Sequence, residues 1–443
     1  MHILQQILFA LLAAAAIYLF ARKVREINRN IKLGKDRDLG DHPAERWRNV
    51  LLLAFGQKKM FKRPTVAVLH FLVYAGFVII NVEILEIVLD GILGTHRLFA
   101  PLLGSLYPIL IGFFEILAAL VLVSCAIFLV RRNILKIKRL NQPELNGWPR
   151  TDANAILATE IILMALLLVM NAADYNLQQL HAEHYFYTGK PFWVSGLIAP
   201  LFSGTGETGL VALERTCWWL HIAGIFAFLN YLPYSKHLHI ILAFPNAYYA
   251  KLVPQGEMRN MPEIQNEVLY MMEPDKAPTD LDPNAAPPRF GAKDVQDLSW
   301  KNLLDAYACT ECGRCTANCP ANITGKKLSP RKIMMDTRDR LEAVGKNIDQ
   351  NKEFVDDGKS LLHDHITTEE LRACTTCNAC VEACPVSIDP LDIILQLRRN
   401  LVMEESNAPQ EWNMMFGNIE NNMAPWKFSP DDRDKWVGEM IED

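Results

Sequence analysis

The amino-acid sequence predicts a mainly α-helical protein in two parts. A five-helix transmembrane bundle, with its N-terminus outside and its C-terminus inside, is followed by a smaller cytoplasmic α-helical domain. Three observations support this prediction: long apolar runs in residues 1–250, a polar and charged composition in residues 255–443, and a repeated cysteine motif in the second part. A chain of 443 residues normally forms two or three domains. The formal net charge of −5 argues against a nucleic-acid-binding protein.

Five apolar segments are expected to cross the lipid bilayer, because each approaches the ~20 residues that span a hydrocarbon core. The first is preceded by no Lys or Arg and is followed by Arg22, Lys23 and Arg25, which favours an uncleaved helix over a cleaved signal peptide. The transmembrane domain is expected to cover residues 1–250, with helices at about 3–20, 66–89, 106–130, 155–170 and 216–240.

The basic residues between these segments predict their orientation, because Lys and Arg are retained on the cytoplasmic side. Thirteen of them lie between Arg22 and Arg63 and six between Arg131 and Arg150, whereas the other two loops carry only Arg97 and Lys190. We therefore expect a multi-pass protein of the bacterial inner membrane with its second domain in the cytoplasm. Residues 47–59 are expected to form a helix that lies on the membrane surface or packs on the cytoplasmic domain.

The cytoplasmic part contains the motif C-x2-C-x2-C-x3-C-P twice, ending at Pro320 and at Pro385. Three thiolates at this spacing bind one iron–sulfur cube, and the fourth reaches the neighbouring cube. Zinc knuckles and disulfides are the alternatives, and both fit a triple cysteine run less well. The spacing predicts one [4Fe–4S] cluster on Cys309, Cys312, Cys315 and Cys384, and a second on Cys374, Cys377, Cys380 and Cys319.

The remaining boundaries follow from composition. Residues 251–295 contain seven prolines between Pro254 and Pro288 and are expected to be an extended linker. Residues 296–400 are expected to form a ferredoxin-type domain, with two helices at 329–344 and 353–362 in the long insert between the motifs. Residues 401–443 form an acidic tail that could dock a partner subunit or wrap its own domain.

Four histidines lie in or beside the apolar segments, where ionisable side chains are costly and indicate function. Imidazoles can bind haem iron from both faces between facing helices. His70 and either His237 or His239 share the inner side and are expected to form the axial pair of a haem b. His221 would serve a second haem nearer the outer face, and the alternative is that these histidines are bonded to carbonyl groups. Glu83, Glu86 and Glu115 are expected to make interhelical bonds, with proton or quinone contacts as the alternative.

Taken with His70, His221 and His239, the segment Pro233-Tyr-Ser-Lys-His-Leu-His resembles the haem b-binding gamma subunit of respiratory nitrate reductase and the membrane subunit of heterodisulfide reductase. In the nitrate reductase family two histidines on helix two face two on helix five, and this chain keeps only His70 on helix two.

The cysteine domain resembles the iron–sulfur region of heterodisulfide reductase and of the iron–sulfur subunits of anaerobic glycerol-3-phosphate dehydrogenase and glycolate oxidase. Those proteins often continue into CCG domains, and no cysteine follows Cys384. The resemblance therefore implies that a separate polypeptide carries the substrate chemistry.

Together these features predict a membrane-bound electron-transfer subunit of a quinone-linked oxidoreductase, with no catalytic residue of its own. Electrons would pass, in either direction, between menaquinone and a soluble cytoplasmic redox partner through the two clusters and haem b. The partner would be a CCG-domain protein, a dehydrogenase or an electron-transfer flavoprotein. The alternatives are a haem-free iron–sulfur membrane anchor and a redox-sensing scaffold.

Overall fold

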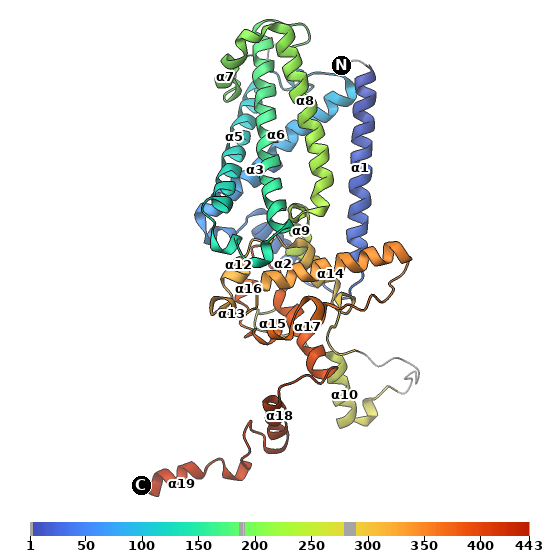
Figure 1. Cartoon of the computed structure of the whole chain (residues 1–443), viewed down its shortest axis with the longest axis vertical. Coiled ribbons are helices and arrows are strands. Elements are labelled where there is room, and N and C mark those ends of the chain that lie inside the picture. Colours follow the sequence, from blue (N-terminus) through green and yellow to red (C-terminus); the bar gives the residue numbers. More distant parts are fainter. Residues whose placement is uncertain (1–2, 186–188, 190, 279–288, 443) are drawn as a thin grey trace.

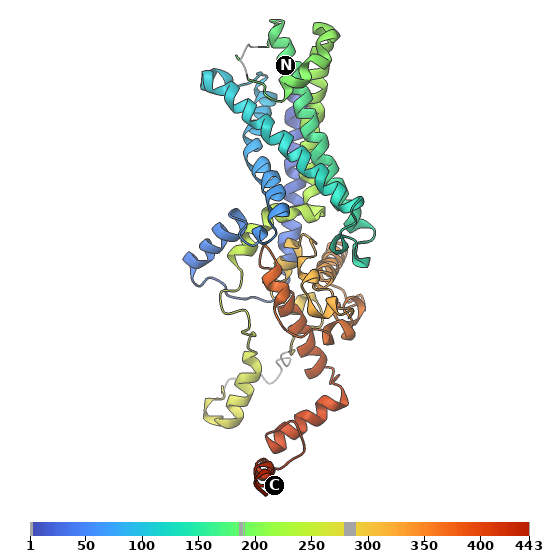
Figure 2. The same ribbon diagram turned by 90° about the vertical axis from the view of Figure 1, so that its left-hand side faces the viewer.

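The computed structural model describes residues 3–185, 189, 191–278 and 289–442, and these residues form helices and turns without a β-strand. An upright helical bundle stands on a smaller helical domain, and the C-terminal segment projects away from both (Figure 1, Figure 2). Lys190, expected in an outer loop, and Pro283, Pro287 and Pro288 of the expected linker lie outside the described residues.

Within the described part of the chain, four segments are long and apolar enough to cross a membrane. They are α1 (Ile3–Ile31), α3 (Pro64–Leu93), the segment Ala100–Asn133 that ends in α5 (Tyr107–Asn133), and α6 (Trp148–Gln179). The chain is therefore a membrane protein by the length and composition of these helices.

A fifth helix, α8 (Gly206–Tyr231), packs against α6 and α1. Figure 1 shows it between these two helices. It carries Glu214 and Arg215 and is not one of the four apolar segments. A membrane-spanning role for α8 therefore stays a prediction.

The expected fifth helix at 216–240 differs from the structure at both ends. Helix α8 ends at Tyr231, and two short 3-10 turns, η7 (Leu232–Tyr234) and η8 (Lys236–Leu238), lead into α9 (His239–Tyr248). Pro233 has no backbone N–H to continue the helix, and the Ser235 hydroxyl accepts a hydrogen bond from the backbone N–H of His237 at 3.1 Å. His221 and His239 therefore do not lie on one continuous helix.

Helix α1 extends well beyond the apolar run and joins the two parts of the molecule. Its last turns pack on α11 (Trp300–Ala308) and α14 (Pro330–Asn351) of the cysteine domain. The buried Asn30 amide donates a hydrogen bond to the Tyr307 hydroxyl at 3.0 Å, and Arg29 forms an ion pair with Asp349. The cysteine domain is thus held against one end of the bundle.

The segment expected to lie on the membrane surface forms α2 (Pro43–Asn49) and the π-helical turn η1 (Val50–Phe55). One face, with Val50 and Ala54, packs on Ala247 of α9. The other face exposes Trp47, Leu51 and Phe55. This two-sided arrangement suits a helix at the membrane interface.

The cysteine domain is built from short helices around α14. Its core contains Leu303, Ile333, Leu341, Leu361, Ile393 and Leu397, all buried. The other helices are α12 (Arg314–Ala317), α13 (Pro320–Ile323), α15 (Thr368–Arg372), α16 (Ala379–Ala383) and α17 (Pro390–Met403). The expected helix at 329–344 corresponds to α14, which continues to Asn351.

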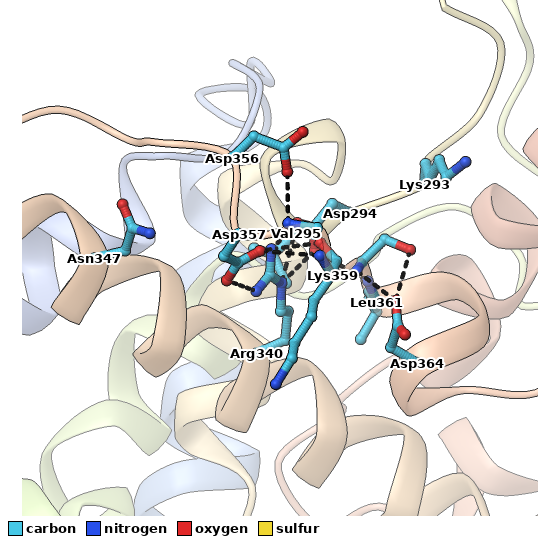
Figure 3. Close-up of polar contacts among 12 residues, drawn as sticks. Lys293, Asp294, Val295, Arg340, Asn347, Asp356, Asp357, Lys359, Leu361 and Asp364 are labelled. Atoms are coloured by element: carbon cyan, nitrogen blue, oxygen red, sulfur yellow. Dashed lines mark hydrogen bonds and ion pairs between the residues drawn. The ribbon is translucent and has the colours of Figure 1, made fainter.

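The helix expected at 353–362 is absent, because hydrogen bonds to polar groups of this segment hold it in another conformation (Figure 3). The buried Arg340 of α14 donates hydrogen bonds to Asp294 at 3.0 Å, to Asp357 at 2.6 Å and to the Lys359 carbonyl at 2.7 Å. Gly358 has a φ of +69°, which ends helical geometry there. A contact distant in the sequence therefore fixes this segment as a loop.

The linker and the tail carry helices that project from the body of the protein (Figure 1). They are α10 (Pro262–Met272), α18 (Gln410–Asn422) and α19 (Lys435–Glu442). Trp412 contacts Arg372, whereas Trp426 and Trp436 are exposed.

The shorter elements of the chain are η2 (Met60–Lys62), α4 (Ala100–Leu103), η3 (Gly104–Leu106), η4 (Lys138–Leu140), η5 (Pro143–Leu145), α7 (Ser195–Ile198), η6 (Ala199–Thr205), η9 (Pro274–Lys276), η10 (Val295–Asp297), η11 (Leu361–His365) and η12 (Pro430–Asp432).

Candidate metal centres

The two cysteine runs fold into the same loop. In each run the residue before the second cysteine has a positive φ, 53° at Glu311 and 56° at Thr376. The residue after it also has a positive φ, 69° at Gly313 and 59° at Asn378, and a short helix follows. Non-glycine residues rarely adopt this conformation, so the repetition indicates that both loops are shaped around the same kind of ligand.

The fold brings the cysteines together in the two sets that the spacing predicts. One cavity is lined by Cys319 of the first motif together with three cysteines of the second motif. A second, larger cavity is lined by three cysteines of the first motif together with Cys384. Cys315 of the first set packs in the same group of hydrophobic side chains as Cys374 and Cys380 of the second set. The two sets are therefore neighbours.

The chemistry of these sites fits thiolate ligands around a cationic centre. Burial, with a smaller contribution from neighbouring thiol groups, raises the pKa of Cys309 to about 12 and that of Cys384 to about 11. Metal ligation requires the thiolate, so these buried sets need positive charge between them. Backbone N–H groups point at the sulfur atoms, from Thr376 to Cys374 at 3.4 Å and from Ile388 to Cys384 at 3.3 Å.

The arrangement favours a cluster over a single ion. Among the residues that the structure describes, no three His, Cys, Asp or Glu side chains converge closely enough to hold one metal ion. A [4Fe–4S] cluster places each of its four thiolates on a different iron and spreads them apart. Both cysteine sets therefore fit clusters.

The two sets differ in their access to water. Cys377 of the second set is exposed, whereas Cys309 of the first set is buried. The first set lines the larger cavity together with residues of the membrane bundle, and in the second set Cys377 reaches the surface.

The larger cavity has a volume of about 500 Å³ and lies between the bundle and the cysteine domain. Residues of α3, α5, α6 and α9 form its bundle side, and the first cysteine set forms part of the opposite side. His70, His237 and His239 all line it, whereas His221 does not. The structure thus joins three of the four predicted histidines to the first cysteine set.

Two of these histidines are oriented through one ring nitrogen. His70 donates a hydrogen bond from Nδ1 to the Gln57 Oε1 atom at 3.0 Å, and His239 donates from Nδ1 to the Lys236 carbonyl at 3.0 Å. In this tautomer Nε2 carries the lone pair that binds a metal.

The third histidine stands beside the second. The rings of His237 and His239 lie 5.6 Å apart, and the buried Nε2 of His237 has no hydrogen-bond partner among the described residues. Burial lowers the pKa of His237 to about 3 and also lowers that of His239.

Arginine side chains surround the cavity, and the sequence did not indicate this role. Arg139 donates a hydrogen bond to the Cys312 carbonyl at 2.7 Å, and Arg331 donates to the Arg139 carbonyl at 2.7 Å. The Nη2 group of Arg314 is buried without a partner in the described structure and lines the cavity. Arg131 and Arg132 line it as well. This positive wall suits an anionic occupant.

His221 lies elsewhere in the bundle and is fully buried. Its Nδ1 donates a hydrogen bond to the Leu163 carbonyl at 2.9 Å, and its buried Nε2 has no partner among the described residues. The His221 ring is therefore oriented through Nδ1, as the rings of His70 and His239 are. Unlike them, it does not line the larger cavity.

Comparison with known proteins supports a domain that binds [4Fe–4S] clusters. Residues 308–388 match the 4Fe-4S dicluster domain family. A probable iron–sulfur-binding oxidoreductase, FadF of Bacillus subtilis, is 28% identical over 462 residues, which cover 98% of this chain and 61% of the relative. The EtfAB:quinone oxidoreductase of Syntrophomonas wolfei is 28% identical over 441 residues, with 94% and 55% covered. This chain therefore spans a little over half the length of these two relatives.

The iron–sulfur part also has relatives among heterodisulfide reductases. One component of the ferredoxin/F(420)H(2)-dependent CoB-CoM heterodisulfide reductase of Methanosarcina acetivorans is 36% identical over 108 residues, or 24% of this chain and 53% of the relative. No solved structure gave a significant match. The resemblance to iron–sulfur oxidoreductases and heterodisulfide reductases is confirmed, and the resemblance to a haem b-binding gamma subunit stays a prediction. The chain is thus similar to electron-transfer proteins that use iron–sulfur clusters.

Proposed function

We propose that this chain is a membrane-bound electron-transfer component that connects a soluble cytoplasmic redox partner with the menaquinone pool. The observation that carries this proposal is the single cavity of about 500 Å³ that is lined both by the first cysteine set and by three histidines. Such a cavity lets redox groups held by the two parts of the chain approach each other without intervening protein.

The cysteine sets would each hold one [4Fe–4S] cluster, with the ligand sets that the spacing predicts. His70 of α3 and His239 of α9 would be the axial ligands of a haem b in the shared cavity, since both direct Nδ1 to an acceptor and leave Nε2 for iron. His237 is the alternative to His239. When bound, the clusters and the haem each carry one electron at a time.

The protein residues have separate tasks around these groups. Gln57 and the Lys236 carbonyl orient the histidine rings. The buried Nη2 group of Arg314 offers a donor to an anionic group such as a haem propionate. A second haem would be held by His221, and α3 carries no histidine other than His70 to serve as its partner.

The exposure of Cys377 suggests where the soluble partner docks. An electron arriving there would reach the second cysteine set first, then the first set, and then the histidine cavity. We take the partner to be an electron-transfer flavoprotein, because a relative covering most of this chain is named EtfAB:quinone oxidoreductase. The bacterial inner membrane, a cytoplasmic cysteine domain and α8 as a fifth span complete the proposal, in agreement with the basic loops on that side.

The proposal is tested with the full chain purified anaerobically in lipid nanodiscs. The protein is reduced stoichiometrically with dithionite, mixed with a water-soluble naphthoquinone, and followed by its haem and cluster absorption. We expect rapid reoxidation of the wild-type protein and at least a tenfold slower reaction in His70→Ala, with His42→Ala, an exposed histidine, as the matched control. A protein with clusters but no haem band would support the haem-free anchor, and a protein that quinone does not reoxidise would support the scaffold.

A further inference from the structure

At the end of the bundle opposite the cysteine domain, five carboxyl groups are buried around one arginine, Arg97. Each of the five side chains belongs to a residue that is at most 7% exposed. Arg97 lies in the turn between α3 and α4 and is itself 7% exposed. The five carboxyl groups belong to Glu83, Glu86, Asp90, Glu115 and Asp174.

Two of the five are held by the arginine residue itself. The Arg97 guanidinium donates to Asp174 from Nε at 2.8 Å and from Nη2 at 2.6 Å, and its backbone N–H donates to Asp90 at 2.8 Å. Asp90 also accepts from the Thr95 hydroxyl at 2.5 Å. The guanidinium charge is therefore matched mainly by Asp174.

Two more accept hydrogen bonds from other donors. Glu86 accepts from the backbone N–H of Phe99 at 2.7 Å and from the Tyr107 hydroxyl at 2.8 Å. Glu115 accepts from the backbone N–H of Val194 at 2.9 Å and from the Asn171 amide at 3.2 Å. Both of these carboxylates have the donors that an ionised group needs.

Glu83 is the exception. It is 1% exposed, and neither of its carboxyl oxygens has a hydrogen-bond partner within the described structure. The nearest cation is the Nη1 atom of Arg97, 3.9 Å from Oε1. The other titratable groups that face this site are carboxyl groups, Glu86 on the same helix and Glu115 on α5, and the neutral amide of Asn171 on α6 also faces it.

His96 stands at the edge of the same cluster. Its Nε2 lies 3.8 Å from Asp174. His96 faces Asp174, and Arg215 of α8 also interacts with Asp174. Arg97 is therefore the cation that acts on Glu83.

Ionised Glu83 would be a buried charge without donors among like charges, which is strongly unfavourable. A neutral carboxylic acid removes this repulsion. We propose that Glu83 is a proton-binding site inside the bundle: it is held as a neutral carboxylic acid and exchanges its proton through the polar cluster around Arg97.

This site bears on the proposed function only through the use of the proton that Glu83 would store. Reduction of a quinone to a quinol by two electrons consumes two protons, and a buried exchangeable carboxylic acid is a group that can store one of them. The presence of the proton on Glu83 does not depend on that use, so the two proposals can fail separately.

The test is infrared spectroscopy of the full-length oxidised protein in nanodiscs at neutral pH, in H2O and in D2O. We expect a carbonyl-stretch band of a protonated carboxylic acid that shifts in D2O and is lost in Glu83→Gln. Glu86→Gln is the matched control on the same helix, and it should keep the band because its own carboxylate accepts two hydrogen bonds. The amide of Glu83→Gln has the shape and the neutrality of the protonated acid, so this variant should unfold at the same temperature as the wild-type protein within about 2 °C.

Two results would overturn the site. In one, the wild-type and Glu83→Gln spectra are identical in the acid carbonyl region, which means that Glu83 is ionised. In the other, the band is present but does not shift in D2O, which means that the proton does not exchange. Neither result depends on quinone or haem, so a failed quinone assay leaves this test intact.

Discussion

Lys236 forms a buried ion pair with Glu311. Lys236 immediately precedes His237, and Glu311 immediately precedes Cys312, so this contact joins the histidine segment to the first cysteine loop. Arg338 supports the pair by donating to the other Glu311 oxygen at 2.8 Å. The two sides of the cavity are therefore fixed relative to each other, which a short electron-transfer distance requires.

Replacing this lysine tests the connection. We expect Lys236→Met to lower the free energy of unfolding by about 3 kcal/mol, because it leaves a buried carboxylate with one partner instead of two. Denaturant unfolding of the full chain in detergent measures the change. Lys435→Met is the control, since Lys435 pairs with Asp432 at the surface and should contribute less than about 1 kcal/mol. Equal losses in the two variants would contradict a special role for the buried pair.

The cysteine sets predict a specific loss of iron. Two [4Fe–4S] clusters require about eight iron atoms per chain. Cys312→Ala removes one ligand of the first set and should lower the iron and acid-labile sulfide content to about half. Cys217→Ala, in helix α8, should keep the full content, because Cys217 is a buried cysteine that lines neither cavity. Unchanged iron in Cys312→Ala would show that this residue is not a ligand.

Gln57 is expected to position His70 for haem binding. Gln57→Leu removes the acceptor for the Nδ1 hydrogen and should weaken haem binding about tenfold to a hundredfold, as loss of such partners does at metal sites. Haem titration of the apoprotein, followed by optical absorption, measures the affinity. Gln57→Glu, which keeps an acceptor, should restore binding and shift the haem potential downwards. A Gln57→Leu protein with wild-type affinity and spectrum would remove Gln57 from the site.

A buried aspartate outside the membrane predicts a pH dependence of stability. Burial raises the pKa of Asp336 in α14 to about 6, although Lys332 opposes the shift. The folded state therefore binds this proton more tightly than the unfolded chain does, and the stabilisation present below about pH 4 is lost as the pH rises through 6. The loss is of the order of 2 kcal/mol. In Asp336→Asn the free energy of unfolding should lack this decrease between pH 4 and 7, and an identical pH profile in both proteins would contradict the assignment.

The sequence could predict what local spacing determines. The two cysteine sets meet as expected because three ligands of each set lie within seven residues of chain and the proline after the fourth directs it to the other set. The helical character of the membrane part followed from apolar length alone.

Contacts distant in the sequence determine the rest. The helix expected at 353–362 does not form because Arg340 donates a hydrogen bond to Asp357, a contact that only the folded domain creates. Likewise, no local pattern indicates that Gln57 lies beside His70, or that Arg314 leaves a donor free in the cavity. The break after Tyr231 could have been anticipated from Pro233.

The connection between the cysteine sets and the histidine cavity is tested most directly by an anaerobic redox titration of the full chain, followed together by electron paramagnetic resonance and optical absorption. We expect two [4Fe–4S] signals in the reduced protein and a low-spin haem band that disappears in His70→Ala while both cluster signals remain. Cluster signals without any haem band in the wild-type protein would contradict the proposed connection between the cysteine sets and the histidine cavity.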